Sequence, residues 1–353
     1  MYIELKNINK SFGDFKASDN VSFGIEKGKL IGLLGPSGSG KTTILRMLAG
    51  LEKQDSGDII IDGKNVNKLP SNERGIGFVF QSYALFPFMT VYDNIAYGLK
   101  VQKKDKKFIK QRVAELLELV GLPDVGKRYP DQLSGGQRQR IARALAPQPE
   151  LLLLDEPFAA IDAKVRKELR TWLRDTIDKI GITSIFVTHD QDEAIEVADE
   201  IVITNKGRVE QIGNPVEIYL EPKTPFVAQF IGQSAVIEDY SKLKGFETAE
   251  GKTSAIIRPE FIEINKFEDS EYHQFESSME DAVVEEVSFR GNAFEVKASI
   301  DGISVTGRYP LNASRLKKGD KVKVLIKKLY TIDENTTNIL INKALDDSEL
   351  YYI

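Results

Sequence analysis

The chain has 353 residues, of which 41% are hydrophobic and 29% charged, and its formal net charge is -5. This length is enough for one large domain and a smaller one. A mildly acidic chain has no overall field that attracts DNA, RNA or anionic lipid, so we expect no nucleic-acid partner. Because the sequence contains no cysteine, disulfides and thiolate metal sites are excluded.

The N-terminal segment, MYIELKNINKSFGD, is polar and alternating, and it lacks the apolar core of a signal peptide. No apolar run approaches the roughly 20 residues that span a bilayer. We therefore expect a chain that is soluble when isolated and that reaches a membrane only through a partner.

Short apolar runs alternate with longer helical patterns through the first two thirds of the chain. Helices are predicted over Phe108–Val120 and Ala163–Ile180, each with an apolar stripe and a following glycine. Strands that alternate with helices indicate a largely parallel α/β sheet. The runs predicted as strands are Leu30–Leu34, Ile59–Ile61, Gly77–Phe80, Leu151–Leu154, Ser184–Val187 and Ile201–Thr204.

The pattern changes near Gly232, where period-two alternation replaces the helical period. Phe294–Ile300 and Val322–Ile326 alternate in this way, and Asp301-Gly302 and Gly319-Asp320 mark turns. This part is predicted to form a small β-barrel or sandwich.

A glycine-rich segment, Gly35–Thr42, fits the pattern G-x-x-x-x-G-K-[ST] at every fixed position. It follows an apolar strand and precedes the helical run Thr43–Ala49, so a flexible linker is the weaker interpretation. Its glycines let several backbone N–H groups face one anion, and the helix N-terminus adds partial positive charge. Lys41 can reach the β- and γ-phosphates of ATP, and the Thr42 hydroxyl can bind Mg²⁺.

Polar residues follow three of the predicted strands. Asp155 and Glu156 end the strand Leu151–Leu154, where Asp155 can hold Mg²⁺ and Glu156 can activate water as a general base. Gln81 and His189 occupy two further strand ends, where they can reach the metal, water or a phosphate. Alone, each pattern is more typical of an ordinary turn; together with the glycine-rich loop they predict one Mg-ATP site.

A second helix start has the chemistry of an anion site. Ser134-Gly135-Gly136-Gln137 opens a helix, and a serine before a helix is by default a simple N-cap. Two phosphate-binding helix starts with one expected nucleotide suggest instead that two chains share each nucleotide.

These motifs, in this order over roughly residues 1–235, resemble the nucleotide-binding subunits of ABC transporters. The resemblance implies that Gly35–Thr42 is the Walker A loop and Leu151–Asp155 the Walker B strand. It implies a catalytic group of Glu156, His189 and Gln81, and magnesium ligands Thr42, Gln81 and Asp155. It also implies that nucleotide is bound, in part by the partner chain, through Phe12, Gly35, Pro36, Ser37, Gly38, Ser39, Gly40, Lys41, Thr42, Thr43, Ser134, Gly135, Gly136, Gln137 and Asp162. Within this set, the resemblance implies that Phe12 stacks on adenine, that Leu133–Gln137 is the signature segment, which closes over the partner's ATP, and that Asp162 is the D-loop aspartate.

The fold implied by the resemblance is an α/β P-loop NTPase with a C-terminal all-β OB-like barrel. We expect a nucleotide-binding domain over 1–235, with a helical subdomain at about 85–150, and an OB-like (TOBE) regulatory domain over 236–353. The element Arg258-Pro259-Glu260 resembles a motif of that second domain. The helix 165–174 looks most like sulfate/thiosulfate importers.

The implied partners are a second copy of the chain, membrane permease subunits and, through them, a solute-binding protein, at the cytoplasmic face of the membrane. The aromatic residues Tyr83, Phe86, Phe88 and Tyr92 can form a permease-docking groove or pack in a core. Alternatives left open are the same ATPase role in a ferric iron, polyamine or sugar importer, a non-transport ABC ATPase, and a barrel that senses a small anion or regulator.

Overall fold

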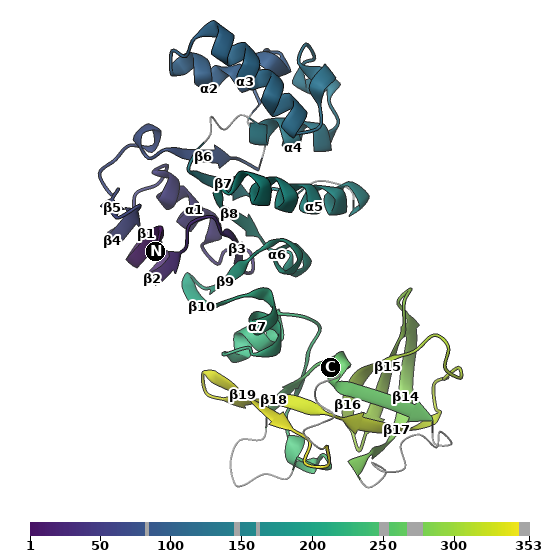
Figure 1. Cartoon of the computed structure of the whole chain (residues 1–353). Coiled ribbons are helices and arrows are strands. Elements are labelled where there is room, and N and C mark those ends of the chain that lie inside the picture. Colours follow the sequence, from purple (N-terminus) through teal and green to yellow (C-terminus); the bar gives the residue numbers. More distant parts are fainter. Residues whose placement is uncertain (82–84, 145–148, 160–162, 247–253, 267–277, 346–353) are drawn as a thin grey trace. The chain divides into compact units, whose positions relative to one another are not determined.

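The computed structural model describes residues 1–81, 85–144, 149–159, 163–246, 254–266 and 278–345, without the side chains of residues 139, 140 and 142–144. The chain divides into two units, Met1–Pro215 and Val216–Ile353, and each is described by itself (Figure 1).

The first unit contains a six-stranded sheet with the strand order β10-β9-β3-β8-β7-β6. All neighbouring strands are parallel except β10, which runs antiparallel to β9. The central strands are buried along their whole length, because helices or a second sheet cover both of their faces. The strands are β3 (Leu30–Leu34), β6 (Ile76–Val79), β7 (Leu151–Asp155), β8 (Thr183–Thr188), β9 (Glu200–Asn205) and β10 (Arg208–Gly213).

A four-stranded antiparallel sheet, in the order β2-β1-β4-β5, lies on the other side of helix α1 (Lys41–Ala49). Ile44, Leu45 and Leu48 of α1 belong to one buried cluster with residues of both sheets. The expected strand Ile59–Ile61 therefore forms, but as the end of an antiparallel strand outside the parallel sheet. The strands are β1 (Ile3–Phe12), β2 (Phe15–Ile25), β4 (Ser56–Ile61) and β5 (Lys64–Asn65).

Three helices form a separate cluster within the first unit: α2 (Val91–Val101), α3 (Lys106–Leu119) and α4 (Gly135–Ala144) (Figure 1). Thr90 and Asp105 cap α2 and α3 through hydrogen bonds from backbone N–H groups in the first turn. These helices fall within the range 85–150 expected for a helical subdomain. Two further helices, α5 (Ala163–Ile180) and α6 (Gln191–Val197), precede and follow β8. Among the described residues, no helix is long and apolar enough to cross a membrane.

The second unit is built mainly from a five-stranded antiparallel sheet in the order β13-β17-β14-β15-β16. The sheet curls until its outer strands meet, since a Cβ at Gly307 of β16 would lie 2.9 Å from side-chain atoms of both Ile262 and Ile264 in β13. The expected OB-like barrel is confirmed. Its strands are β13 (Ile262–Lys266), β14 (Glu280–Phe289), β15 (Phe294–Ile300), β16 (Ile303–Tyr309) and β17 (Lys321–Ile326).

A smaller four-stranded sheet, in the order β11-β12-β18-β19, completes the second unit. Its strands are β11 (Ala235–Ile237), β12 (Ala255–Ile257), β18 (Lys328–Asp333) and β19 (Thr336–Ile341). The helices α7 (Pro215–Leu220) and α8 (Pro225–Phe230) come before it in the chain.

The division at 215/216 lies earlier than the domain boundary expected at 235/236, because α7 and α8 pack against the second unit. The fully buried Arg258 donates a hydrogen bond to the carbonyl of Tyr219, and its guanidinium lies 4.4 Å from the centre of the Tyr219 ring. Ala228 of α8 joins a buried cluster with Phe261 and Tyr330. The Arg-Pro-Glu element thus anchors both helices.

Candidate active site

The glycine-rich loop between β3 and α1 is so tightly curled that only glycine fits at two of its positions. At Gly40, φ is +95° and a Cβ would lie 2.0 Å from the carbonyl oxygen of Ala17. At Gly35 a Cβ would lie 2.2 Å from the carbonyl oxygen of Thr204. Because real Cβ atoms do not approach backbone oxygens this closely, the loop conformation depends on both glycines.

Lys41, the first residue of α1, carries a buried positive charge inside this loop. Its side chain is 6% exposed, and its ammonium donates to the carbonyls of Gly35 (2.8 Å) and Pro36 (2.9 Å) and to the Ser39 hydroxyl (3.3 Å). All three acceptors are neutral, and burial lowers the pKa of Lys41. A desolvated cation with neutral partners, at a helix start lined by N–H groups, fits a bound phosphate chain.

Two of the three ligands expected for Mg²⁺, Thr42 and Asp155, meet at the end of β7, whereas the Gln81 amide is bonded to Glu156. The Thr42 hydroxyl donates to Asp155 Oδ1 at 3.0 Å, and burial raises the pKa of Asp155 against the opposing hydrogen bond from Thr42. In the described part of the chain, no group of three or more His, Cys, Asp or Glu side chains could hold a metal. One hydroxyl and one carboxylate suit Mg²⁺, which takes few protein ligands and completes its shell with water and phosphate oxygens.

Glu156 contacts both of the other residues that are expected to take part in catalysis, Gln81 and His189. The Gln81 amide donates to Glu156 Oε2 at 2.9 Å, and His189 Nδ1 lies 3.4 Å from Glu156 Oε1. Glu156 itself has φ +45°, a conformation that is uncommon for a residue with a side chain and that collects at functional sites. The ends of β6, β7 and β8 thus bring Gln81, Glu156 and His189 together, although 108 positions separate the first from the last.

A cavity of about 230 Å³ lies over the loop, lined by Phe15, Ser37, Gly38, Gly40, Lys41, Thr42, Thr43 and Glu156. Phe15 was not predicted; it faces Phe12 across the turn of the β1–β2 hairpin and is 52% exposed. Phe12, the expected adenine-stacking residue, is 48% exposed and does not line this cavity. Its ring lies 4.9 Å from the ammonium of Lys10.

The second predicted helix start is well formed but separate from this cavity. The backbone N–H of Ser134 donates to Gln137 Oε1 (3.0 Å), and the N–H of Gln137 donates to the Ser134 hydroxyl (3.3 Å). This reciprocal capping pair is exposed at the start of α4, where Gly136 packs closely against Val165. None of the residues 134–137 lines the phosphate-loop cavity. The expected D-loop residue Asp162 lies outside the described residues.

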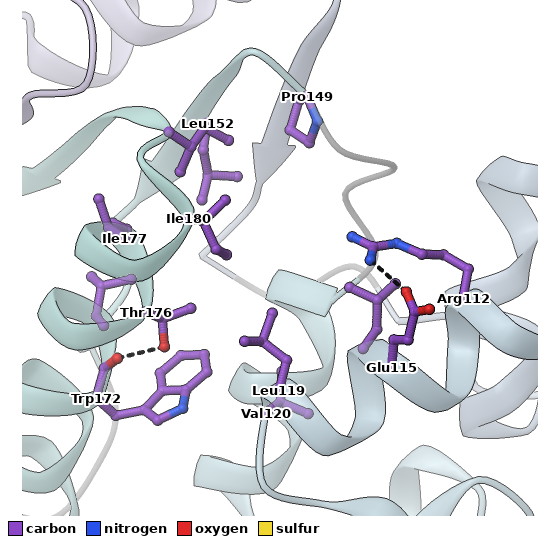
Figure 2. A pocket seen from close by; sticks show the side chains of 13 residues that line it. Arg112, Glu115, Leu119, Val120, Pro149, Leu152, Trp172, Thr176, Ile177 and Ile180 are labelled. Atoms are coloured by element: carbon purple, nitrogen blue, oxygen red, sulfur yellow. Dashed lines mark hydrogen bonds and ion pairs between the residues drawn. The ribbon is translucent and has the colours of Figure 1, made fainter.

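An apolar cavity of about 490 Å³ lies elsewhere in the first unit, between α3 and α5 (Figure 2). Trp172, the sole tryptophan of the chain, lines it together with Leu119 and Ile180, and an Arg112–Glu115 ion pair (2.9 Å) lies at its edge. None of the residues predicted to bind nucleotide contributes to this cavity.

Comparison with known proteins agrees with this geometry. Residues 18–159 match the ABC transporter family. Three sulfate/thiosulfate import ATP-binding proteins are similar to the chain over most of its length. The relative from Thermosynechococcus vestitus is 55% identical and the match covers 74% of this chain and 78% of the relative. The relative from Acinetobacter baylyi is 52% identical, over 75% of this chain and 80% of its own length. The relative from Rhodopseudomonas palustris is 58% identical, over 67% of this chain and 70% of its own length.

Two solved structures resemble the nucleotide-binding part. The ATP-binding cassette MJ0796, a dimer in a post-hydrolysis state bound to ADP and Pi, has a TM-score of 0.54 and 34% identity and covers 60% of this chain and 98% of its own. The structure of cbiO1 from Clostridium perfringens, part of an ABC transporter complex, has a TM-score of 0.58 and 30% identity and covers 62% of this chain and 91% of its own. Together with the phosphate loop, the carboxylates at the end of β7 and the signature helix start, these likenesses show that the chain belongs to the ABC transporter family, as one of its ATP-hydrolysing subunits.

Proposed function

We propose that two copies of this chain clamp Mg-ATP between them and use its hydrolysis to drive uptake of a small anion, sulfate or thiosulfate, through a separate membrane permease. The observation that carries the proposal is the separation of two anion sites within one chain. The phosphate loop has its own cavity, while the exposed start of α4 at Ser134 contributes nothing to it. A second copy, placed head to tail, supplies the missing half.

In this arrangement each nucleotide lies between Gly35–Thr43 of one chain and Ser134–Gln137 of the other. Thr42, Asp155 and Gln81 would hold Mg²⁺, which would supply positive charge to the terminal phosphate. Lys41 binds the β- and γ-phosphates, and Phe12 stacks on the adenine. Asp162 belongs to the segment that meets the partner chain.

The contacts of Glu156 with Gln81 and His189 at the strand ends support a catalytic role for each of the three residues. Glu156 takes the proton of the attacking water, and the contact with the Gln81 amide fixes its carboxylate. His189, on the other side of Glu156, reaches the γ-phosphate or the same water. Glu156 also lines the phosphate-loop cavity, so a water held there would lie beside its carboxylate.

The permease contact is expected on the helical cluster, next to Phe88, which is 93% exposed. A shallow groove of about 410 Å³ beside it is lined by Met89, Asp93, Tyr97, Lys100 and Val101. Of the aromatic residues proposed for docking, Phe86 packs on Tyr97 with ring centres 4.8 Å apart, and Tyr92 packs into the helical core. Phe88 is thus the best candidate, and Tyr83 lies outside the described residues.

The choice of sulfate or thiosulfate rests on the names of the three relatives, each more than half identical to this chain. The ATPase does not touch the solute, so ferric iron, polyamine and sugar import are the competing outcomes of a test. The complex would include a solute-binding protein and would hold this chain at the cytoplasmic face of the membrane. The β unit would act as a regulatory domain or as a support for the dimer.

The test is co-expression with permease genes adjacent in the genome, followed by uptake into right-side-out membrane vesicles or proteoliposomes that contain ATP. The panel is labelled sulfate, thiosulfate, ferric iron, a polyamine and maltose. ATP-dependent uptake of sulfate or thiosulfate, abolished by Glu156→Gln, supports the proposal. Uptake of another member of the panel would replace the solute, and absence of any ATP-dependent uptake would contradict the transport role.

A further inference from the structure

The segment that carries His189, between β8 and α6, is held from both sides by a closed set of hydrogen bonds. Thr188, the last residue of β8, is 2% exposed; its hydroxyl donates to the carboxylate of Glu193 and accepts the backbone N–H of Asp190 at 3.0 Å. Asp190 in turn caps α6, because its Oδ1 accepts the backbone N–H of Glu193 at 3.2 Å. Thr188, Asp190 and Glu193 therefore fix the backbone immediately before and after His189.

Glu193 is an acidic side chain in a place where a carboxylate is costly. It is 6% exposed, and burial raises its pKa, against the hydrogen bond from Thr188 and the charges of Arg170 and Arg166. The two guanidiniums come from α5 and approach Glu193 Oε1 to 3.8 Å (Arg170) and 4.0 Å (Arg166), and both also lie 3.8 Å from Asp190 Oδ2. Two cations from one helix thus hold both acids that flank the His189 segment.

The imidazole of His189 has few restraints of its own. Its side chain is 60% exposed, and its contact with Glu156 is 3.4 Å long. A cavity of about 140 Å³ lies between the catalytic residues and the Glu193 network. It is lined by Glu156 and His189 and by Thr188, Arg166 and Glu193. Because little packing surrounds the ring, the backbone at 188–190 decides where the ring points.

We infer that Glu193, bridged to α5 by Arg166 and Arg170 and to β8 by Thr188, is a positioning residue for His189. Glu193 does not line the phosphate-loop cavity, and it acts by keeping His189 within reach of Glu156 and the γ-phosphate. The inference rests on the proposed function of the site, in which His189 takes part in hydrolysis. It adds a dependence of the chemical step on an acid four positions later in the chain.

A purely structural role, as the third residue of a capped helix, predicts a different outcome. A helix-end carboxylate contributes to stability and leaves turnover alone. A positioning role lowers kcat with little change in KM for ATP, since ATP binding depends on the phosphate loop and not on His189. The two roles therefore separate in steady-state kinetics.

The first test compares Glu193→Gln with Glu196→Gln, measuring Mg-ATPase of the full chain together with its Tm. Glu196 is a matched control: it lies on the same helix, is half exposed, and pairs with the same Arg170 at 3.0 Å, but has no bond to Thr188. Glu193→Gln is expected to lower kcat about ten- to a hundredfold, as misplacement of a reacting group does, with KM changed less than about twofold. Glu196→Gln is expected to keep kcat within about twofold of the wild type.

The second test changes Thr188, the hydrogen-bond partner of Glu193. It therefore tests the inference even if the Glu193→Gln protein does not fold. Thr188→Val removes the hydroxyl at nearly constant volume and should reproduce the loss in kcat, whereas Thr188→Ser keeps the hydroxyl and should restore most of it. In single-turnover assays on a His189→Ala background, Glu193→Gln should cause no further loss, since the group that it positions is gone.

A normal kcat in both Glu193→Gln and Thr188→Val would overturn the inference, and so would a loss of equal size with and without His189. These outcomes differ from a failure of the proposed function. In that case the wild-type chain itself shows no ATPase activity that depends on Glu156, whereas the inference alone fails when Glu156→Gln stops turnover and Glu193→Gln does not.

Discussion

Replacement of Lys41 by methionine should affect nucleotide binding and folding stability very differently. Methionine keeps the length of the side chain and removes the buried charge. The ammonium makes three hydrogen bonds to Gly35, Pro36 and Ser39, so its removal leaves three neutral acceptors without this donor. At about 1 kcal/mol for each acceptor, partly offset by the desolvation that the cation no longer suffers, we expect a loss of unfolding free energy of at most about 2 kcal/mol.

The effect on ATP binding should be larger. In the occupied loop the same ammonium would make charge-assisted hydrogen bonds to two phosphate groups, each contributing about 1.5–3 kcal/mol. Their loss corresponds to a Kd for Mg-ATP that rises about a hundredfold or more.

The assay is calorimetric titration of Mg-ATP into Lys41→Met and wild-type protein, with thermal unfolding of each nucleotide-free protein. Lys64→Met, which removes an exposed charge from β5, is the matched control and should leave the Kd unchanged. A folded Lys41→Met protein whose Kd for Mg-ATP stays within about threefold of the wild type would refute the reasoning about the buried cation.

Three further predictions concern the same site. Gly40→Ala should lower the Tm by several degrees and abolish ATP binding, because its Cβ would meet the carbonyl of Ala17. Gly38→Ala is the control: open space surrounds its Cβ, so thermal unfolding and binding assays should show only the smaller effect of its positive φ. Burial raises the pKa of Asp155, so protonation should begin to weaken Mg²⁺-dependent ATP binding at a pH above the ordinary range of an aspartate. Asp155→Asn protein should show no such pH dependence in the same binding titrations. A Mg²⁺ effect on ATP affinity that persists unchanged down to about pH 4 would contradict this. Phe12→Ala should weaken ATP binding by about 1–3 kcal/mol and leave binding of inorganic tripolyphosphate unchanged, as measured by competition; equal losses for both ligands would exclude stacking.

Much of the nucleotide site could be predicted from the sequence because its motifs are local. Gly35–Thr42 and Asp155-Glu156 are continuous segments, and the strand-and-helix pattern around them places them at one sheet edge. The network around Glu193 could not be predicted, since it joins side chains of α5 and α6 that no sequence spacing relates. Its local signal was an acidic residue three positions after a capping aspartate, which by itself indicates only a helix start.

The strands β1 and β2 show why the N-terminal sheet was not predicted. Ile3 and Leu5 alternate as expected of a half-buried strand, but the register shifts between Leu5 and Ile8, where Asn7 has φ +51°. This irregularity moves the next buried side chain, Ile8, out of period two, so the alternation is too short to predict a ten-residue strand. β4 was expected in the parallel sheet but pairs antiparallel with β1. Its own sequence does not indicate this partner.

The boundary between the two units also depends on tertiary contacts. The sequence changes character near Gly232, where helical periodicity ends, whereas the packing divides the chain at Pro215 because Arg258 and its neighbours hold α7 and α8. A guanidinium buried among aromatic rings and carbonyls has no signature beyond the short Arg-Pro-Glu element.

The sharing of one triphosphate by two chains is tested most directly by the mass of Glu156→Gln protein in solution, with and without Mg-ATP. Light scattering should give about twice the 39.5 kDa of one chain when ATP is present and the single-chain mass when it is absent. Adding Ser134→Arg to the same protein, at a residue that does not line its own phosphate-loop cavity, should return it to the single-chain mass in ATP. A Glu156→Gln protein that binds ATP tightly yet stays a single chain would contradict the shared site.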